Sequence, residues 1–227
     1  MGGCQELSKT KKPSHRTSGA TRGAILNAAE SLMSQRGYTA VSLREIAKEA
    51  DVSLSSVTHF FKTKEKLLAA IYEHHTKPMN ARRNELLREA LRISNLDERL
   101  AAIVRAFVMP AFSSSSENGG GVRFTRLRGL MSMEGHPVEK KIIASAFDET
   151  SNRFADAIAD AIPGADRTSI LWRGHFLLGA LYYTLITPGR IDRLTGHAGA
   201  GSDHNRSIDE LVRATVASFK ELSNGGQ

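Results

Sequence analysis

LREIAKEADVSLSSVTHFFK, residues 43–62, carries the clearest structural pattern of this chain. Its first half places apolar side chains at the spacing of one helix face, at Leu43, Ile46, Ala47 and Ala50. Charged residues occupy the positions between them, which indicates a short amphipathic helix with one buried side. Because Ala47 is small, a second helix can approach this buried side closely.

A tight turn and a second short helix follow. Ser42 is a good N-cap for the first helix, and Glu45 three residues later completes a capping box. Asp51 tolerates the left-handed backbone that a tight turn needs, and Ser53 can cap the second helix. The second helix gains its buried side from Val57, Phe60 and Phe61. Two helices at this spacing predict a helix-turn-helix, whose second helix lies in the major groove of DNA.

Residues 21–72 resemble the N-terminal DNA-binding domain of TetR-family regulators. The resemblance rests on residues 41–72, VSLREIAKEADVSLSSVTHFFKTKEKLLAAIY, and on the Arg-Gly-Tyr of residues 36–38. Two residues depart from the family pattern: Asp51 stands where the family often has Gly, and Thr58 where it often has Tyr. The resemblance implies a dimeric regulator that binds DNA and senses a small ligand.

The resemblance also assigns DNA-contacting roles. His59 and Lys64 look like the family's contacts with backbone phosphates, and Ser42 can join them through its hydroxyl or amide group. Lys64 stands at a helix N-terminus, where the helix dipole also favours a phosphate. We expect Arg44 to carry much of the base recognition, because the other groove-facing residues include no Arg or Gln for a bidentate base contact. These other residues are Ser53, Leu54, Ser55, Ser56 and Thr58.

Composition and charge agree with a DNA-binding protein. The chain has 227 residues, of which 41% are hydrophobic and 24% charged, as in globular proteins. Its net charge is +7. Residues 1–67 hold 11 Lys and Arg against 6 Asp and Glu, whereas the remaining 160 residues hold 20 against 18. The basic excess therefore accompanies the helix-turn-helix, where a phosphate-binding surface needs it.

We expect an all-α fold of about nine helices in two domains. A three-helix domain with the helix-turn-helix should cover residues 19–67, and a helical ligand-binding and dimerisation domain residues 68–223. The composition of residues 1–18 predicts a flexible basic arm, which is either a solvated tail or a further contact with phosphates or the minor groove. Residues 188–206 are expected to form a loop, and Ser207 to cap the last helix.

Large apolar residues on the helices of the second domain are candidates for an effector site. They are either core residues or the lining of a cavity for a small hydrophobic ligand, as the resemblance implies. Three arginines crowd one of these helices; they are either surface charges, or one of them closes over an anionic ligand head. The candidate lining residues are Phe107, Phe112, Phe124, Leu127, Met131, Trp172, Phe176 and Tyr182, and the arginines are Arg123, Arg126 and Arg128.

A homodimer is expected from the helix around residues 170–186. This stretch is hydrophobic nearly all round, so it needs cover on more than one side. The domain itself can cover one side, and a partner subunit the other. We therefore predict that the last two long helices form the dimer interface, and that the dimer binds a near-palindromic operator in double-stranded DNA.

The prediction is a sequence-specific DNA-binding transcriptional regulator, a repressor released from its operator by a small hydrophobic effector. The alternative is a constitutive DNA-binding or protein-binding adaptor of the same fold without a ligand. We expect no catalytic residue, metal or cofactor, because no nucleophile, metal-binding or phosphate-loop motif stands at a readable spacing. The longest apolar stretch, residues 176–186, is too short for a membrane span, and the single cysteine, Cys4, fits a reducing cytoplasm.

Overall fold

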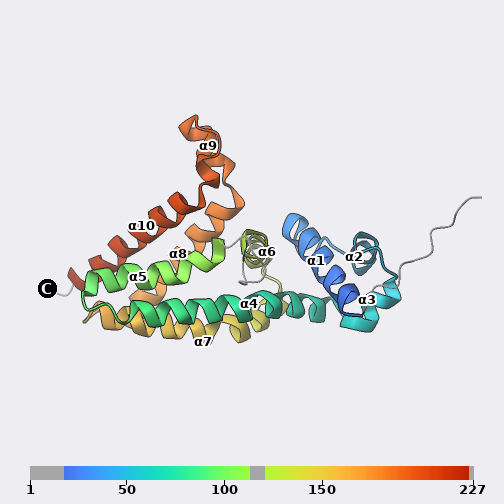
Figure 1. Cartoon of the computed structure of the whole chain (residues 1–227), viewed down its shortest axis with the longest axis horizontal. Helices are drawn as coiled ribbons and strands as arrows, with labels where there is room; N and C mark the ends of the chain where they lie inside the picture. The colour runs from blue at the N-terminus through green and yellow to red at the C-terminus, as the bar shows by residue number, and fades with distance from the viewer. Residues whose placement is uncertain (1–17, 113–120, 225–227) are drawn as a thin grey trace, which may run out of the picture.

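The computed structural model describes residues 18–112 and 121–224, and the regular structure in these residues is entirely helical (Figure 1). The all-α prediction is therefore confirmed. The elements are α1 (Ser18–Arg36), α2 (Leu43–Glu49), α3 (Leu54–Phe61), α4 (Lys64–Ala90), α5 (Leu96–Val108), the 3-10 helix η1 (Met109–Phe112), α6 (Gly121–Glu134), α7 (Pro137–Ala161), α8 (Arg167–Ile186), α9 (Gly189–Thr195), the 3-10 helix η3 (Ala200–Ser202) and α10 (His204–Asn224).

The helix-turn-helix forms as its sequence predicts. Ser42 caps α2 with a complete capping box, because its side chain accepts the N–H of Glu45 while the Glu45 side chain accepts the N–H of Ser42. Asp51 adopts the left-handed conformation with φ of 53°, and the Val52 N–H donates to the Ala47 carbonyl at 3.0 Å. Ser53 then caps α3 through the N–H of Ser56. Local capping thus fixes the angle between the two helices.

Helix α4 connects the helix-turn-helix to the rest of the molecule. Thr63 caps its first turn by accepting the Lys66 N–H. The helix then continues to Ala90 with Pro78 inside it (Figure 1). The domain boundary expected between residues 67 and 68 therefore falls within a continuous helix rather than in a linker.

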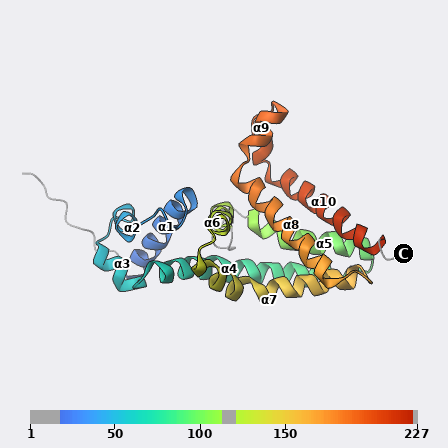
Figure 2. The same ribbon diagram turned by 180° about the vertical axis from the view of Figure 1, so that it is seen from behind.

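Two clusters of buried apolar side chains make up the core. The first joins α1, α2, α3, the first half of α4, α6 and the first half of α7. The second joins the end of α4 with α5, α7, α8 and α10. Figures 1 and 2 show α6 between α1 and this second group from both sides. Helix α6, expected in the ligand-binding domain, thus packs its apolar face on the DNA-binding end of the molecule.

The C-terminal region differs from its prediction. Residues 188–206 were expected to form a loop, but they contain α9 and η3. The last helix begins at His204, and the prediction that Ser207 caps it is wrong. The Asp203 carboxylate accepts the Arg206 N–H at 3.1 Å, and the Ser207 N–H already donates to the Asp203 carbonyl. An aspartate four residues earlier therefore acts as the cap.

Two predicted features lie outside the described residues. The basic arm falls on residues 1–17, and residue 18 is the first of α1. The single cysteine, Cys4, also belongs to that segment.

Candidate functional site

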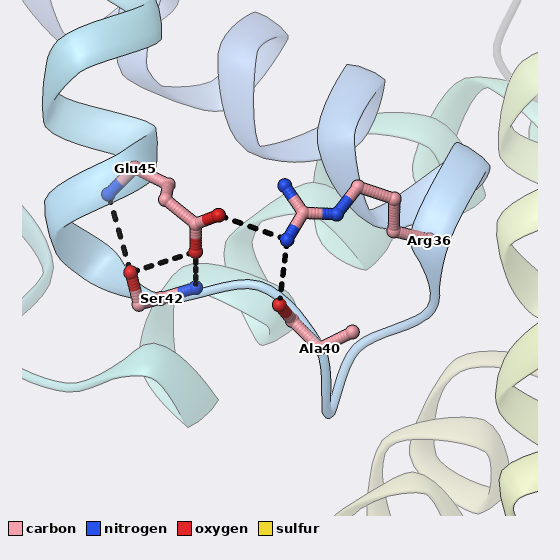
Figure 3. Close-up of polar contacts among 4 residues, drawn as sticks. All are labelled: Arg36, Ala40, Ser42 and Glu45. Carbon is pink, nitrogen blue, oxygen red and sulfur yellow. Dashed lines mark hydrogen bonds and ion pairs between the residues drawn. The ribbon is translucent and has the colours of Figure 1, made fainter.

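A polar network fixes the N-terminus of α2 against the end of α1 (Figure 3). The Ser42 N–H and hydroxyl both donate to the Glu45 carboxylate at 2.8 Å. Arg36 Nη2 lies 2.8 Å from the other carboxylate oxygen of Glu45 and donates to the Ala40 carbonyl at 3.0 Å. Hydrogen bonds from Ser42 and the ion pair with Arg36 lower the pKa of Glu45 to about 2. The Ser42 hydroxyl proton is thus used within the protein.

Helix α3 presents a hydroxyl-rich surface. Ser53, Leu54, Ser55 and Thr58 are exposed, and Ser56 is half-buried. The Ser53 hydroxyl lies 2.8 Å from the hydroxyls of both Ser55 and Ser56. Thr58 donates its hydroxyl to backbone carbonyls of its own helix. The Ser53 oxygen is occupied because it also accepts the Ser56 N–H. The oxygens of Ser55, Ser56 and Thr58 keep acceptor capacity, so this surface suits base-edge donors and thymine methyl groups more than phosphates.

Arg44 of α2 and His59 of α3 add nitrogen-bearing side chains to this surface. Both side chains are exposed. No ion pair or hydrogen bond of the described chain engages the guanidinium of Arg44, which leaves its donors available to a ligand. The His59 ring packs edge-on against Phe60, with 5.3 Å between ring centroids. Arg44 is therefore the one predicted base-reading residue whose guanidinium N–H groups are available to a base.

Lys64 is held at the start of α4 by an aromatic ring. Its Nζ lies 4.1 Å from the centroid of Tyr38, and the side chain is half-buried. Burial lowers the pKa of the Lys64 ammonium group. Burial and the carboxylate of Glu65, which accepts the Tyr38 hydroxyl at 3.3 Å, raise the pKa of Tyr38 to about 12. The cation thus occupies a fixed position at a helix N-terminus.

The end of α6 touches the same region. The Glu134 carboxylate accepts the Thr39 N–H at 3.2 Å and the Thr39 hydroxyl at 3.1 Å. The His136 ring packs edge-on against Tyr38 with 5.1 Å between centroids. Because Tyr38 also supports Lys64, the junction between α6 and α7 is in contact with the residues that position a predicted phosphate contact.

The eight residues predicted to line an effector cavity are not brought together. Phe124, Leu127 and Met131 are fully buried in the cluster shared with α1, and Trp172 and Phe176 are 56% and 55% exposed on the outer face of α8. Their positions follow from helix periodicity, since one face of each helix meets one neighbour. The other three are dispersed: Phe112 is buried in η1, Phe107 lies on α5 and Tyr182 on α8.

An apolar cavity of about 210 Å³ lies between α5, α7, α8 and α10. Phe107 is the only one of the eight predicted residues that lines it. Its other walls include Ile103, Phe154, Gly174, His175 and Phe219. A cavity with this lining suits the apolar part of a small molecule.

Two buried arginines lie where α4, α5, α6, α7 and α8 meet. Arg83 is 1% exposed and Arg128 is 4% exposed. Arg83 donates from Nε to the Phe107 carbonyl at 3.0 Å, and its guanidinium carbon lies 4.2 Å above the Phe107 ring. Arg128 stacks on Phe147 at 3.7 Å and lies 5.4 Å from the Tyr182 ring. Burial and repulsion from Arg128 lower the pKa of Arg83 to about 9.

The three arginines of α6 differ in exposure: Arg123 and Arg126 are exposed, and Arg128 is buried. Arg83 was not among the predicted residues, although its sequence position carries a signal. It falls four residues after Met79 and four before Leu87, both buried, and so stands within the apolar stripe of α4. A cation at such a position indicates a special environment.

Two other kinds of site are absent from the described residues. Within residues 18–112 and 121–224, no three His, Cys, Asp or Glu side chains gather in a way that could hold a metal ion. No helix in the same residues combines the length and hydropathy that crossing a membrane requires.

Two family models match the chain. The model described as bacterial regulatory proteins, tetR family, matches residues 25–71. The model described as tetracyclin repressor-like, C-terminal domain, matches residues 105–218, which is half of the chain. The two matches cover the helix-turn-helix and the region from α5 to α10.

Similar proteins include two curated regulators. The HTH-type transcriptional repressor NemR of Escherichia coli (strain K12) is 39% identical over 67 residues, which cover 30% of this chain and 34% of NemR. YttP of Bacillus subtilis (strain 168), named as a probable HTH-type transcriptional regulator, is 36% identical over 64 residues, 26% of this chain and 31% of YttP. The chain thus matches about a third of the length of these relatives.

The likeness to solved structures extends over most of the chain. HlyIIR, a hemolysin II transcriptional regulator, superposes with a TM-score of 0.55 at 18% identity, and the match covers 87% of this chain and 98% of HlyIIR. At this identity the likeness shows the fold alone. The fold of most of the chain is therefore a known architecture.

Proposed function

The chain belongs to the TetR family of bacterial DNA-binding transcriptional regulators, and from that premise we propose that it is a homodimeric repressor released from a palindromic operator by a small effector. The observation that carries the proposal is the exposed surface of α3 beside the free guanidinium of Arg44. No other surface of the described chain combines a helix-turn-helix with a lysine held on an aromatic ring at a helix N-terminus, as Lys64 is on Tyr38. We place its action in the cytoplasm, where operator DNA is found.

In the proposed DNA interface, some residues position the protein on the phosphate backbone and others recognise the bases. Lys64 and His59 would contact backbone phosphates, because Lys64 is fixed on Tyr38 and both flank the exposed face of α3. Ser42 would contact DNA from its exposed position at the N-terminus of α2. Its hydroxyl would not act as the donor, because that proton is already donated to Glu45. Arg44 would read base edges together with Ser53, Leu54, Ser55, Ser56 and Thr58.

The dimer interface is proposed to form on α8, with α10 beside it. Large apolar side chains of α8 are exposed in the single chain, and Trp172 packs on Phe176 with 5.8 Å between ring centroids. Gly179 of the same helix has open space around it, which allows a partner helix to come close. A two-fold axis here would set two α3 helices against half-sites about 34–36 Å apart.

The effector is proposed to act through α6. This helix carries Arg128 at its centre and is joined to Thr39 through Glu134 at its end. Its apolar face is buried against the DNA-binding end of the chain. A ligand that binds more tightly when α6 is in one of two positions would favour that position, and α6 would move the helix-turn-helix with it. Regulation requires this difference in affinity between the two states.

Selection of random duplex DNA by the purified full chain tests the proposal. We expect an enriched near-palindrome whose half-site centres are one helical turn apart, and a steep decrease of affinity with salt. A doubled spacing would indicate two dimers on one operator. If no sequence were enriched and all DNA were bound alike, the operator-specific repressor would be ruled out in favour of the adaptor.

A further inference from the structure

We infer that the guanidinium groups of Arg83 and Arg128 form a binding site for the carboxylate of an amphiphilic ligand. This inference rests on the proposed function, because it names the chemical class of the effector. The two side chains come from α4 and α6, which are far apart in sequence, and both are buried. Their burial is the first reason to regard them as a site, because a buried cation without a counter-ion costs free energy.

The second reason is that neither arginine has an acidic partner. No ion pair of the described chain includes Arg83 or Arg128. Instead, the two like charges lie close enough for Arg128 to lower the pKa of Arg83. Cation–π contacts with Phe107 and Phe147 offset part of the cost, but a ring face does not replace an anion.

The third reason is the number of free donors. Nη2 of Arg83 and Nε of Arg128 are buried and have no hydrogen-bond partner, whereas Nε of Arg83 is satisfied by the Phe107 carbonyl. Each unpartnered N–H would donate to one oxygen of a carboxylate. A carboxylate would also bring the negative charge that the pair lacks.

The apolar cavity determines the rest of the ligand. Phe107 lines this cavity and also carries the guanidinium of Arg83 on its ring. The arginine pair and the cavity therefore share one side chain as a common wall. Neither arginine lines the cavity itself, so an aliphatic chain there would bring its carboxylate to the pair by turning the Phe107 ring aside. The site thus fits a medium-length aliphatic carboxylate.

The test measures ligand binding by the full chain in the absence of DNA. Straight-chain carboxylates from hexanoate to dodecanoate are compared with the alcohols of the same lengths, by thermal shift and calorimetry. We expect at least one carboxylate to raise the melting temperature and to bind about tenfold or more tightly than its alcohol, because only the carboxylate satisfies the buried donors. If no carboxylate bound, or if each alcohol bound equally well, the inference would be overturned.

Variants assign the effect to the arginines. Arg128→Met should raise the melting temperature of the ligand-free chain, since it removes a buried like-charge repulsion, and should abolish the preference for carboxylates. Arg126→Met, at an exposed position of the same helix, should change neither property. Arg83→Met is a second test, but it also removes the hydrogen bond to the Phe107 carbonyl, which makes Arg128→Met the decisive variant. A preference that persists in Arg128→Met would refute the site.

DNA binding, measured on the same samples, separates this inference from the proposed function. Carboxylate binding without DNA release would support the site and contradict the effector role. Intact operator binding without carboxylate binding would overturn the site and leave the DNA-binding function standing.

Discussion

The Glu30 carboxylate on α1 lies 2.8 Å from Nε2 of His75 on α4, and both side chains are buried. The His75 ring in turn stacks on Phe124 of α6, with 4.5 Å between centroids and an angle of 17°. Three helices that belong to different parts of the chain are therefore connected through one histidine. Its position explains how α6 is fixed to the DNA-binding end.

Replacement of Glu30 with Ala should destabilise the protein by about 1–3 kcal/mol, because it leaves a buried ring nitrogen of His75 without a partner. Urea denaturation measures this difference. Glu49→Ala, at an exposed position of α2, is the matched control and should cost much less. Equal costs for the two variants would show that the Glu30–His75 contact contributes nothing.

The stability contribution of Glu45 should depend on pH. Its folded-state pKa is about 2, below the usual 4.5, so the native state binds this proton less tightly than the unfolded chain does. The contribution is therefore fully present above pH 4.5 and is lost as the pH falls through about 2. The difference in melting temperature between the wild type and Glu45→Gln should shrink over this interval. A constant difference would contradict the assignment.

Lys64→Ala should weaken binding to all DNA sequences alike and reduce the slope of log affinity against log salt by about 1. Arg44→Ala should instead reduce discrimination between operator variants, by about 1–3 kcal/mol at the base pair it contacts. Fluorescence anisotropy at several salt concentrations distinguishes the two results. Lys140→Ala, at an exposed position of α7, is the control and should affect neither quantity.

Phe176→Asp should convert the protein to a monomer, because it places a charge in the exposed apolar face of α8. Sedimentation velocity measures the oligomeric state, and circular dichroism shows that the helices remain. Arg88→Asp, at an exposed position of α4, introduces the same side chain elsewhere and should remain dimeric. A dimer in the Phe176 variant would exclude this face as the interface.

Gly37→Ala should cost about 1–2 kcal/mol, because the backbone there has φ of 82° and a side chain strains it. The added Cβ would also lie 1.9 Å from the carboxylate of Glu134 and displace it from Thr39. Thermal unfolding measures the loss. Gly23→Ala, inside α1 with open space around it, should stabilise by about 0.4–1 kcal/mol instead. A neutral Gly37 variant would refute the strain.

The local features of the fold could be predicted from sequence because they depend on neighbouring residues. The capping box of Ser42 and the left-handed Asp51 form within a few positions of one another. The wrong cap predicted for the last helix also concerns neighbouring residues. Ser207 and Asp203 both have side chains suited to capping, and only the backbone conformation decides between them.

The composition of the candidate sensor site could not be predicted in the same way. Which face of α6 meets α1 depends on contacts between segments about a hundred residues apart, such as Thr39 with Glu134. Phe124 and Phe176 look alike in sequence, yet one is fully buried and the other lies on an outer face. Arg83 was not predicted as a site residue, although its helical spacing places it between the buried Met79 and Leu87.

The continuity of α4 has a mechanical consequence. A helix of 27 residues is about 40 Å long, and α4 carries Arg83 near one end and the helix-turn-helix at the other. A tilt of only about 5° at the inner end would displace the outer end by about 3.5 Å, close to the 3.4 Å spacing of successive nucleotides along a DNA strand. A small movement at the inner end could therefore move each DNA-reading end out of register with its half-site.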